Sequence, residues 1–230
     1  MYRMFKKDAL NMAKSIVVLS GGQDSTTCLY WALKKYQKVQ TITFDYGQRH
    51  SIELDAAKKV AQIAGVTNEI LPINTFEKLG GNSLTGSEDV ESSSAEGELP
   101  NTFVPGRNLI FLTFAAAYAY QRGIKDIIAG VCQTDYSGYP DCRQNTIEAL
   151  QVAVNLGMEY QIKIHTPLMW MTKAETVHFA KKVGALEALA WSHTCYNGKV
   201  PPCGECPACG LRAKGFDEAG IKDPLIERTK

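Results

Sequence analysis

The chain lacks a charge surplus of either sign: its 25 lysines and arginines exceed its 24 aspartates and glutamates by one. Proteins that bind the nucleic-acid backbone usually contain more lysine and arginine than aspartate and glutamate, so we expect a small-molecule partner and no nucleic acid. Long apolar runs are also missing. The most apolar stretch, residues 109–120, is too short to cross a bilayer, and we therefore expect no association with a membrane.

Cysteine is scarce and odd in number, at seven in 230 residues, which is far below the density of a disulfide-stapled secreted scaffold. The first fourteen residues contain Lys6, Lys7 and Asp8 and lack the apolar core of a secretory signal. We therefore expect a cytoplasmic protein, in which clustered cysteines bind metal or react. With 45% hydrophobic and 21% charged residues, the chain has enough apolar side chains for a substantial core.

Short apolar segments alternate with amphipathic segments along most of the chain. We expect strands at residues 15–19, 41–44, 69–73, 126–131 and 161–165, and helices at residues 26–36, 51–64, 107–121, 146–156 and 172–184. This alternation predicts an α/β fold, a Rossmann-like parallel sheet with helices on both faces.

Three segments have features of their own. Residues 107–121 are apolar nearly all round and predict a buried helix. Residues 79–106 lack periodicity and contain five acids, which is typical of a lid or of a solvated surface loop. Periodicity also disappears after Trp191, where cysteine, glycine and proline accumulate.

The motif Ser20-Gly-Gly-Gln-Asp-Ser25 lies between the first expected strand and the first expected helix. Unpaired N–H groups and the helix dipole favour an anion at this position, and Gly21 and Gly22 let the backbone approach a phosphate closely. Ser20, Ser25 and Thr26 add hydroxyl donors. The motif lacks the Gly-Lys-Ser/Thr ending of a Walker loop. It therefore predicts a different phosphate-binding turn, the alternative being a glycine turn that only caps a helix.

Four cysteines, Cys195, Cys203, Cys206 and Cys209, lie within fifteen residues on turns rich in glycine and proline. Four thiolates close a tetrahedral zinc site against water, so we expect structural zinc. Alternatives are an iron–sulfur cluster, a redox-active cysteine pair, and His193 in place of Cys195 as a ligand.

The motif at residues 20–25 resembles the SGGxDS loop of the PP-loop ATP pyrophosphatases, which have the adenine nucleotide alpha hydrolase type of fold. The resemblance implies cleavage of ATP between its α- and β-phosphates, and transfer of AMP to a substrate oxygen. It links Asp24 to magnesium, and Lys173, in a segment similar to PLxxxxKxE, to phosphate. The ATP-binding residues that it implies are Leu19, Ser20, Gly21, Gly22, Gln23, Asp24, Ser25, Thr26 and Phe44.

The whole chain, from about Ser15 to Phe216, resembles the 7-cyano-7-deazaguanine synthase (QueC) family of queuosine biosynthesis. The resemblance is carried by residues 20–28, 44–50, 101–108, 130–143 and 167–170 and by the cysteine cluster. It implies that 7-carboxy-7-deazaguanine, ammonia and ATP give the 7-nitrile through an adenylated carboxylate and an adenylated amide. It also implies a homodimer. We expect residues 15–190 to form the PP-loop domain, and residues 191–230 to form a zinc-binding segment packed on it.

Residues 135–143 place hydrogen-bonding and aromatic side chains after an expected strand, where the resemblance implies a pocket for the deazaguanine base. Asp135 or Asp141 is a candidate acceptor for its N–H groups, and Arg143 is a candidate for bidentate contact with its carboxylate. Tyr136 and Tyr139 are aromatic candidates for contact with the base. Arg107 is a candidate catalytic residue that would hold phosphate or the carboxylate. The alternative is a structured turn made by Gly138 and Pro140.

Two other functions are compatible with parts of this pattern. A PP-loop enzyme that thiolates tRNA is one, although the net charge of +1 argues against it. The other is a zinc-knuckle protein that senses nucleotides. Zinc knuckles usually carry basic residues among their ligands, whereas the residues between Cys203 and Cys209 include Glu205 and no lysine or arginine.

Overall fold

Five parallel strands form one sheet in the order β3-β2-β1-β4-β5 in the computed structural model, which describes residues 13–48, 50–86, 89–91, 99–134 and 139–230. The strands are β1 (Lys14–Val18), β2 (Lys38–Asp45), β3 (Asn68–Pro72), β4 (Asp126–Ile128) and β5 (Lys163–His165). The helices are α2 (Gln23–Lys35), α3 (Ile52–Ile63), α4 (Phe76–Leu79), α5 (Arg107–Gln121), α6 (Gln144–Met158), α7 (Lys173–Val183), α8 (Leu186–Leu189), α9 (Pro207–Glu218) and α10 (Pro224–Thr229), with a 3-10 turn at Pro140–Cys142.

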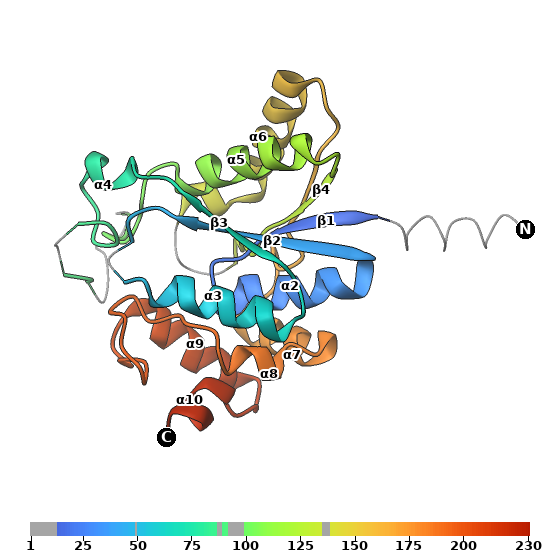
Figure 1. Ribbon diagram of the computed structural model, residues 1–230. Helices are drawn as coiled ribbons and strands as arrows, with labels where there is room; N and C mark the ends of the chain where they lie inside the picture. Colours follow the sequence, from blue (N-terminus) through green and yellow to red (C-terminus); the bar gives the residue numbers. More distant parts are fainter. Residues whose placement is uncertain (1–12, 49, 87–88, 92–98, 135–138) are drawn as a thin grey trace, which may run out of the picture.

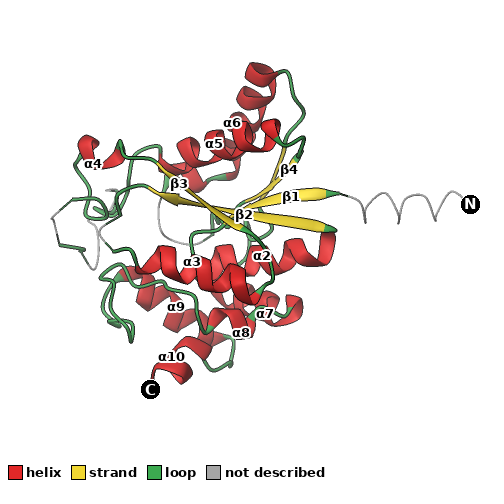
Figure 2. Cartoon of the chain, in the orientation of Figure 1, coloured by secondary structure: helices red, strands yellow, loops and turns green. Residues whose placement is uncertain are grey.

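Helices cover both faces of the sheet. Helices α5 and α6 lie on one face, and α2, α3 and α7–α10 lie on the other (Figures 1 and 2). Alternate β1 residues serve the two cores, because Ile16 packs with the α5–α6 layer and Val17 packs with Leu29 of α2. The predicted Rossmann-like α/β fold is confirmed.

Helix α5 differs from the expectation of burial on all sides. Its buried side chains are Leu112, Ala115, Ala116 and Ala119. By contrast, the Phe114 and Tyr120 side chains are 49% and 46% exposed. A helix in an outer layer has only one face against the sheet, so apolar residues on its other face stay at the surface.

The segment after Trp191 also differs, because it contains two helices that periodicity did not indicate. The buried face of α9 includes Arg212 and Gly215 beside Phe216, so it carries little apolar pattern. A Cβ on Gly215 would lie 2.7 Å from the Lys173 Cβ, which shows how closely α9 approaches α7.

Some described residues within 79–106 are packed in the interior, whereas Leu79 and Leu99 are 66% and 47% exposed. Leu84 and Val104 form a small core with Tyr46 and Phe76.

No described helix combines the length and the apolar content that crossing a bilayer requires.

Candidate active site

The motif at residues 20–25, called the PP-loop from here on, turns sharply between β1 and α2. Helix α2 begins at Gln23 rather than at the expected Thr26, so the motif supplies the first turn of the helix and its unsatisfied N–H groups. The Ser20 N–H donates to the Ser25 hydroxyl at 3.2 Å, and the Thr26 hydroxyl donates to the Gly22 carbonyl at 2.7 Å. The Thr26 hydroxyl therefore holds the turn in shape.

Two glycines make room for the PP-loop. Gly21 has a positive φ of 85°, and a Cβ on it would lie 2.5 Å from the Glu53 carbonyl oxygen. Gly130 follows β4, and a Cβ on it would lie 2.8 Å from the Ser25 backbone nitrogen. Both contacts are with backbone, which cannot swing aside, so each position requires glycine.

Asp24 and Lys173 form an ion pair beside the PP-loop, with 2.7 Å between the Lys173 Nζ and the Asp24 Oδ2. Lys173 is the first residue of α7, which begins with a capping box. The Glu175 N–H donates to the Thr172 hydroxyl at 3.2 Å, and the Thr172 N–H donates to the Glu175 carboxylate at 2.8 Å. The cap therefore fixes the helix start that directs Lys173 toward Asp24.

The second Asp24 oxygen, Oδ1, is buried and has no hydrogen-bond partner among the described residues. A buried carboxylate oxygen at a phosphate-binding turn suits magnesium, which is commonly held by one or two carboxylates together with substrate phosphates. The site therefore fits the magnesium that the PP-loop resemblance implies.

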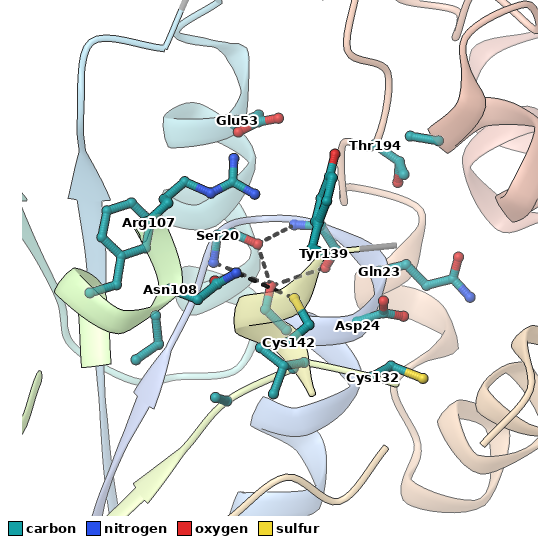
Figure 3. Close-up of a pocket in the computed structure, with 18 of the residues that line it drawn as sticks. Ser20, Gln23, Asp24, Glu53, Arg107, Asn108, Cys132, Tyr139, Cys142 and Thr194 are labelled. Carbon is teal, nitrogen blue, oxygen red and sulfur yellow. Dashed lines mark hydrogen bonds between the residues drawn. The ribbon is translucent and has the colours of Figure 1, made fainter. Parts of the chain in front are cut away.

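A cavity of about 280 Å³ opens above the PP-loop (Figure 3). Its polar end is lined by the PP-loop and Lys173, and its other walls carry aromatic side chains. Of the predicted site residues, those that line it are Ser20, Gly22, Gln23, Asp24, Ser25, Arg107, Tyr139 and Lys173. Predicted residues from four segments far apart in the sequence thus meet at the carboxyl edge of the sheet.

Arg107 stands among tyrosines at the aromatic end. Its Nη1 donates to the Tyr46 hydroxyl at 3.3 Å, and its guanidinium carbon lies 5.6 Å and 6.0 Å from the ring centres of Tyr46 and Tyr139. Burial raises the pKa of Tyr46 to about 12. Burial also raises the pKa of Glu53 to about 7, although the nearby Arg107 opposes the change.

The remaining predicted residues lie elsewhere. Leu19 and Phe44 are buried in the core, and the Phe44 ring stacks on Phe111, with 4.5 Å between the ring centres. Asp141 accepts the Asn108 N–H at 2.9 Å and so supports the start of α5. Arg143 is exposed outside the cavity lining. Asp135 and Tyr136 lie outside the described residues.

Sequence reasoning missed several lining residues, including Tyr46, Glu53, Phe111 and Tyr196. Tyr46 follows β2 directly, and the rule that ligands bind beyond the carboxyl ends of strands was a signal for it. Tyr196 was overlooked because its segment was considered only as a metal site.

The four cysteine sulfurs lie within 4.8 Å of one another, and this set does not include His193. The His193 Nε2 is instead 3.0 Å from the Cys195 carbonyl oxygen, to which it donates. Backbone N–H groups of Glu205 and Cys206 donate to the Cys203 sulfur, both at 3.4 Å. Hydrogen bonding from Cys209 lowers the pKa of Cys206 to about 5. Four sulfurs in this arrangement fit a tetrahedral, thiolate-binding metal such as zinc.

A doubly wound parallel sheet with a Ser-Gly-Gly turn after its first strand defines a nucleotide-binding protein of the PP-loop class. The model of the family described as "Queuosine biosynthesis protein QueC" matches residues 14–220. The chain belongs to this family.

Relatives agree with this assignment. A protein of Chromobacterium violaceum named 7-cyano-7-deazaguanine synthase is 64% identical over 94% of each chain. A protein of the same name from Bacillus subtilis is 55% identical over 89% of this chain and 94% of its own. Among solved structures, the U34-tRNA thiolase NcsA of Methanococcus maripaludis has a TM-score of 0.51 at 16% identity, over 92% of this chain and 67% of that one. That similarity shows a shared fold.

Proposed function

We propose that this enzyme uses ATP to convert 7-carboxy-7-deazaguanine and ammonia to 7-cyano-7-deazaguanine. One observation carries the proposal: the cavity joins a phosphate-binding turn to an aromatic pocket, in a chain 55–64% identical to relatives named for this product. The turn suits the triphosphate, and the aromatic end suits a flat base.

The chemistry explains why one phosphate site serves two bond changes. A carboxylate resists ammonia because the departing oxygen is a very poor leaving group. Transfer of AMP to that oxygen gives an acyl adenylate, from which ammonia displaces AMP to form an amide. A second adenylation, on the amide oxygen, lets AMP leave again as the C≡N bond forms. The nucleotide products are therefore AMP and pyrophosphate.

The residues around the PP-loop have distinct roles in this scheme. The N–H groups at the start of α2 hold phosphate oxygens, and Lys173 neutralises charge on them. Asp24 would hold magnesium, which when bound would supply further stabilisation of phosphate charge.

At the aromatic end, Arg107 would contact the substrate carboxylate or a phosphate, and Tyr139 would contact the base; both side chains line the cavity. Asp141 acts indirectly, because its hydrogen bond to the Asn108 N–H fixes the helix start that presents Arg107. Arg143 is exposed and does not line the cavity, so we assign the carboxylate contact to Arg107 in its place.

We also propose that Cys195, Cys203, Cys206 and Cys209 hold structural zinc and order residues 191–230 as a segment packed on the PP-loop domain. The closed set of four sulfurs supports this metal. The thiolase NcsA structure is described with a [4Fe-4S] cluster, so an iron–sulfur centre is the alternative. Metal analysis with an optical spectrum distinguishes them, because zinc is colourless.

Two further proposals concern the state of the protein. Exposed apolar side chains on α5 and α6, including Phe114, Tyr120, Val152 and Leu156, support a homodimer through this layer. The low cysteine content, with four of the seven cysteines grouped as a possible metal site, supports a reducing, cytoplasmic location. Light scattering of the purified protein tests the dimer.

The function is tested by incubating the protein with 7-carboxy-7-deazaguanine, ammonium and Mg-ATP, followed by mass spectrometry. We expect the nitrile, AMP and pyrophosphate. Asp24→Asn should reduce pyrophosphate release at least about 100-fold, whereas Lys181→Ala, an exposed change on the helix of Lys173, should not. A parallel incubation with tRNA tests the thiolase alternative, and tRNA modification without nitrile would overturn the proposal. ATP binding without pyrophosphate release would favour the nucleotide sensor.

A further inference from the structure

Glu53 is an acidic side chain in the cavity that the scheme above does not use. It lies in the first turn of α3, directly beside the PP-loop, where its carbonyl oxygen excludes any side chain at Gly21. Figure 3 shows Glu53 on the same side of the cavity as Arg107, opposite Gln23 and Asp24.

Within the described part of the chain, no donor lies within hydrogen-bonding distance of the Glu53 carboxylate. Of the groups near it, Arg107 of α5 carries the opposite charge, whereas Tyr46, which follows β2, and Tyr196, in the cysteine segment (residues 191–230), are neutral phenols. The Glu53 side chain is half-buried in the cavity wall. Removing a carboxylate from water without donors is costly, and such costs are concentrated at functional sites.

The other groups in the cavity are already engaged. The Asp24 carboxylate, the second acid among the described lining residues, is paired with Lys173 at 2.7 Å. The His193 side chain is buried and is turned toward the cysteine segment, where its Nε2 donates to the Cys195 carbonyl at 3.0 Å. Tyr46 and Tyr196 are poor proton acceptors because phenols are neutral at neutral pH.

We infer that Glu53 accepts a proton from ammonium and thereby delivers ammonia to the activated carboxylate. The inference rests on the proposed function and adds to it the residue that prepares the nitrogen. Ammonium is the main form of this substrate at neutral pH and has no lone pair with which to attack, so a proton acceptor is required. Arg107 supports the step, because a second cation beside it is disfavoured and neutral ammonia is not.

The step balances as follows. Ammonium transfers one proton to the Glu53 carboxylate and becomes ammonia. The nitrogen lone pair forms a C–N bond with the carbonyl carbon of the acyl adenylate, and the C–O bond to AMP breaks with its electron pair leaving on AMP. The new nitrogen centre then loses a second proton to solvent. The products are the amide, AMP, protonated Glu53 and one released proton.

The experiment separates ammonia delivery from the other steps by using Glu53→Gln in the full chain. Three activities are measured: ATP–pyrophosphate exchange with the acid but without ammonium, amide formation from the acid, and nitrile formation from the supplied amide. We expect unchanged exchange, a loss of about 100-fold in amide formation at neutral pH, and nitrile formation from the amide close to wild type.

The loss in amide formation should also shrink as the pH or the ammonium concentration is raised, because free ammonia then bypasses Glu53. Asp55→Asn, an exposed change on the same helix, should leave all three activities intact. An equal loss in all three activities with a raised KM for acid and amide would overturn the inference, and would assign Glu53 to recognition of the base. If the wild-type protein makes no nitrile from either substrate, the proposed function fails instead.

Discussion

Glu53 has a consequence for stability that is independent of catalysis. Its pKa is about 7 in the folded protein, against an ordinary value of 4.5. Between these values the folded protein keeps a proton that the unfolded chain releases, so the free energy of unfolding falls as the pH rises from about 4.5 to about 7. Above that range the loss is complete.

Glu53→Gln removes this dependence because glutamine does not ionise. We expect the variant to match the wild type at pH ~4 and to exceed it at pH ~8 by up to about 3 kcal/mol. Urea denaturation at the two pH values measures the difference. A stability difference that does not change with pH would show that Glu53 is ordinarily solvated and ionised.

Gly130 controls the approach of β4 to the PP-loop, because a Cβ there would meet backbone atoms of both Asp24 and Ser25. In Gly130→Ala the new methyl group would meet the Ser25 nitrogen at 2.8 Å, so the start of α2 must shift. We expect a stability loss of about 1–3 kcal/mol and weaker ATP binding, because the phosphate-binding N–H groups move with the helix. Calorimetry and equilibrium ATP binding measure the two effects.

The matched control is Gly157→Ala in α6, where a Cβ would meet nothing within 4 Å. That change should stabilise the protein by up to about 1 kcal/mol, because alanine favours a helix interior over glycine. If both alanine variants bind ATP as the wild type does, the close contact at Gly130 does not position the PP-loop.

At the scale of whole elements, a helix whose ends are set by neighbouring residues could be predicted from the sequence. A helix that depends on contacts with distant segments could not. The start of α7 was predictable because Thr172 and Glu175 form a capping box, which needs no residue outside this short segment. Helix α9 was missed because its buried side includes Arg212, whose partners come from other segments. The exposed face of α5 was misjudged because apolar content does not reveal which layer a helix occupies.

The candidate site divides in the same way. The PP-loop residues and Lys173 stand in short contiguous motifs, so spacing alone pointed to them. Glu53 and Tyr196 stand in segments with other apparent roles, an amphipathic helix and a metal-binding turn. Only the fold brings them to the same cavity, and only in three dimensions is it visible that no donor from the described residues reaches the Glu53 carboxylate.

The Arg212 side chain of α9 forms hydrogen bonds with Asp223, which precedes α10, and with residues 192–194, which precede the first cysteine of the cluster. Its Nε and Nη2 donate to the two Asp223 oxygens at 2.6 Å and 2.9 Å. The same side chain also donates to the Ser192 hydroxyl at 2.8 Å and to the Thr194 hydroxyl at 3.0 Å. Because Arg212 is only 3% exposed, these donors have no water to replace lost partners.

We expect Arg212→Met to destabilise the protein by about 3–5 kcal/mol, since it leaves Asp223 buried without its cation. Lys214→Ala on the same helix, whose pair with Glu218 is exposed, should cost less than about 1 kcal/mol. Chemical denaturation of both variants gives the comparison. Equal losses would mean that the Arg212 network contributes no more than a surface pair.

At the scale of the whole molecule, hydrogen bonds connect the cysteine segment directly to the PP-loop. The His193 N–H donates to the Gly21 carbonyl at 2.8 Å, and the His193 ring contacts the Cys195 carbonyl. Tyr196, the next residue after Cys195, lines the cavity. A metal bound by the four cysteines, although it touches no substrate, would therefore hold the turn that binds phosphate and one wall of the pocket.

Removal of the metal with a strong chelator should consequently weaken ATP binding. Loss of the Gly21–His193 hydrogen bond alone is worth about 1 kcal/mol, and with disorder of the segment we expect at least about a tenfold rise in the Kd for ATP. Binding is measured by calorimetry, and protease cleavage within residues 191–230 reports disorder. Re-addition of zinc should reverse both changes, because the thiolates regain their ligand. Unchanged ATP affinity in a metal-free, protease-sensitive protein would show that the PP-loop keeps its shape without the cysteine segment.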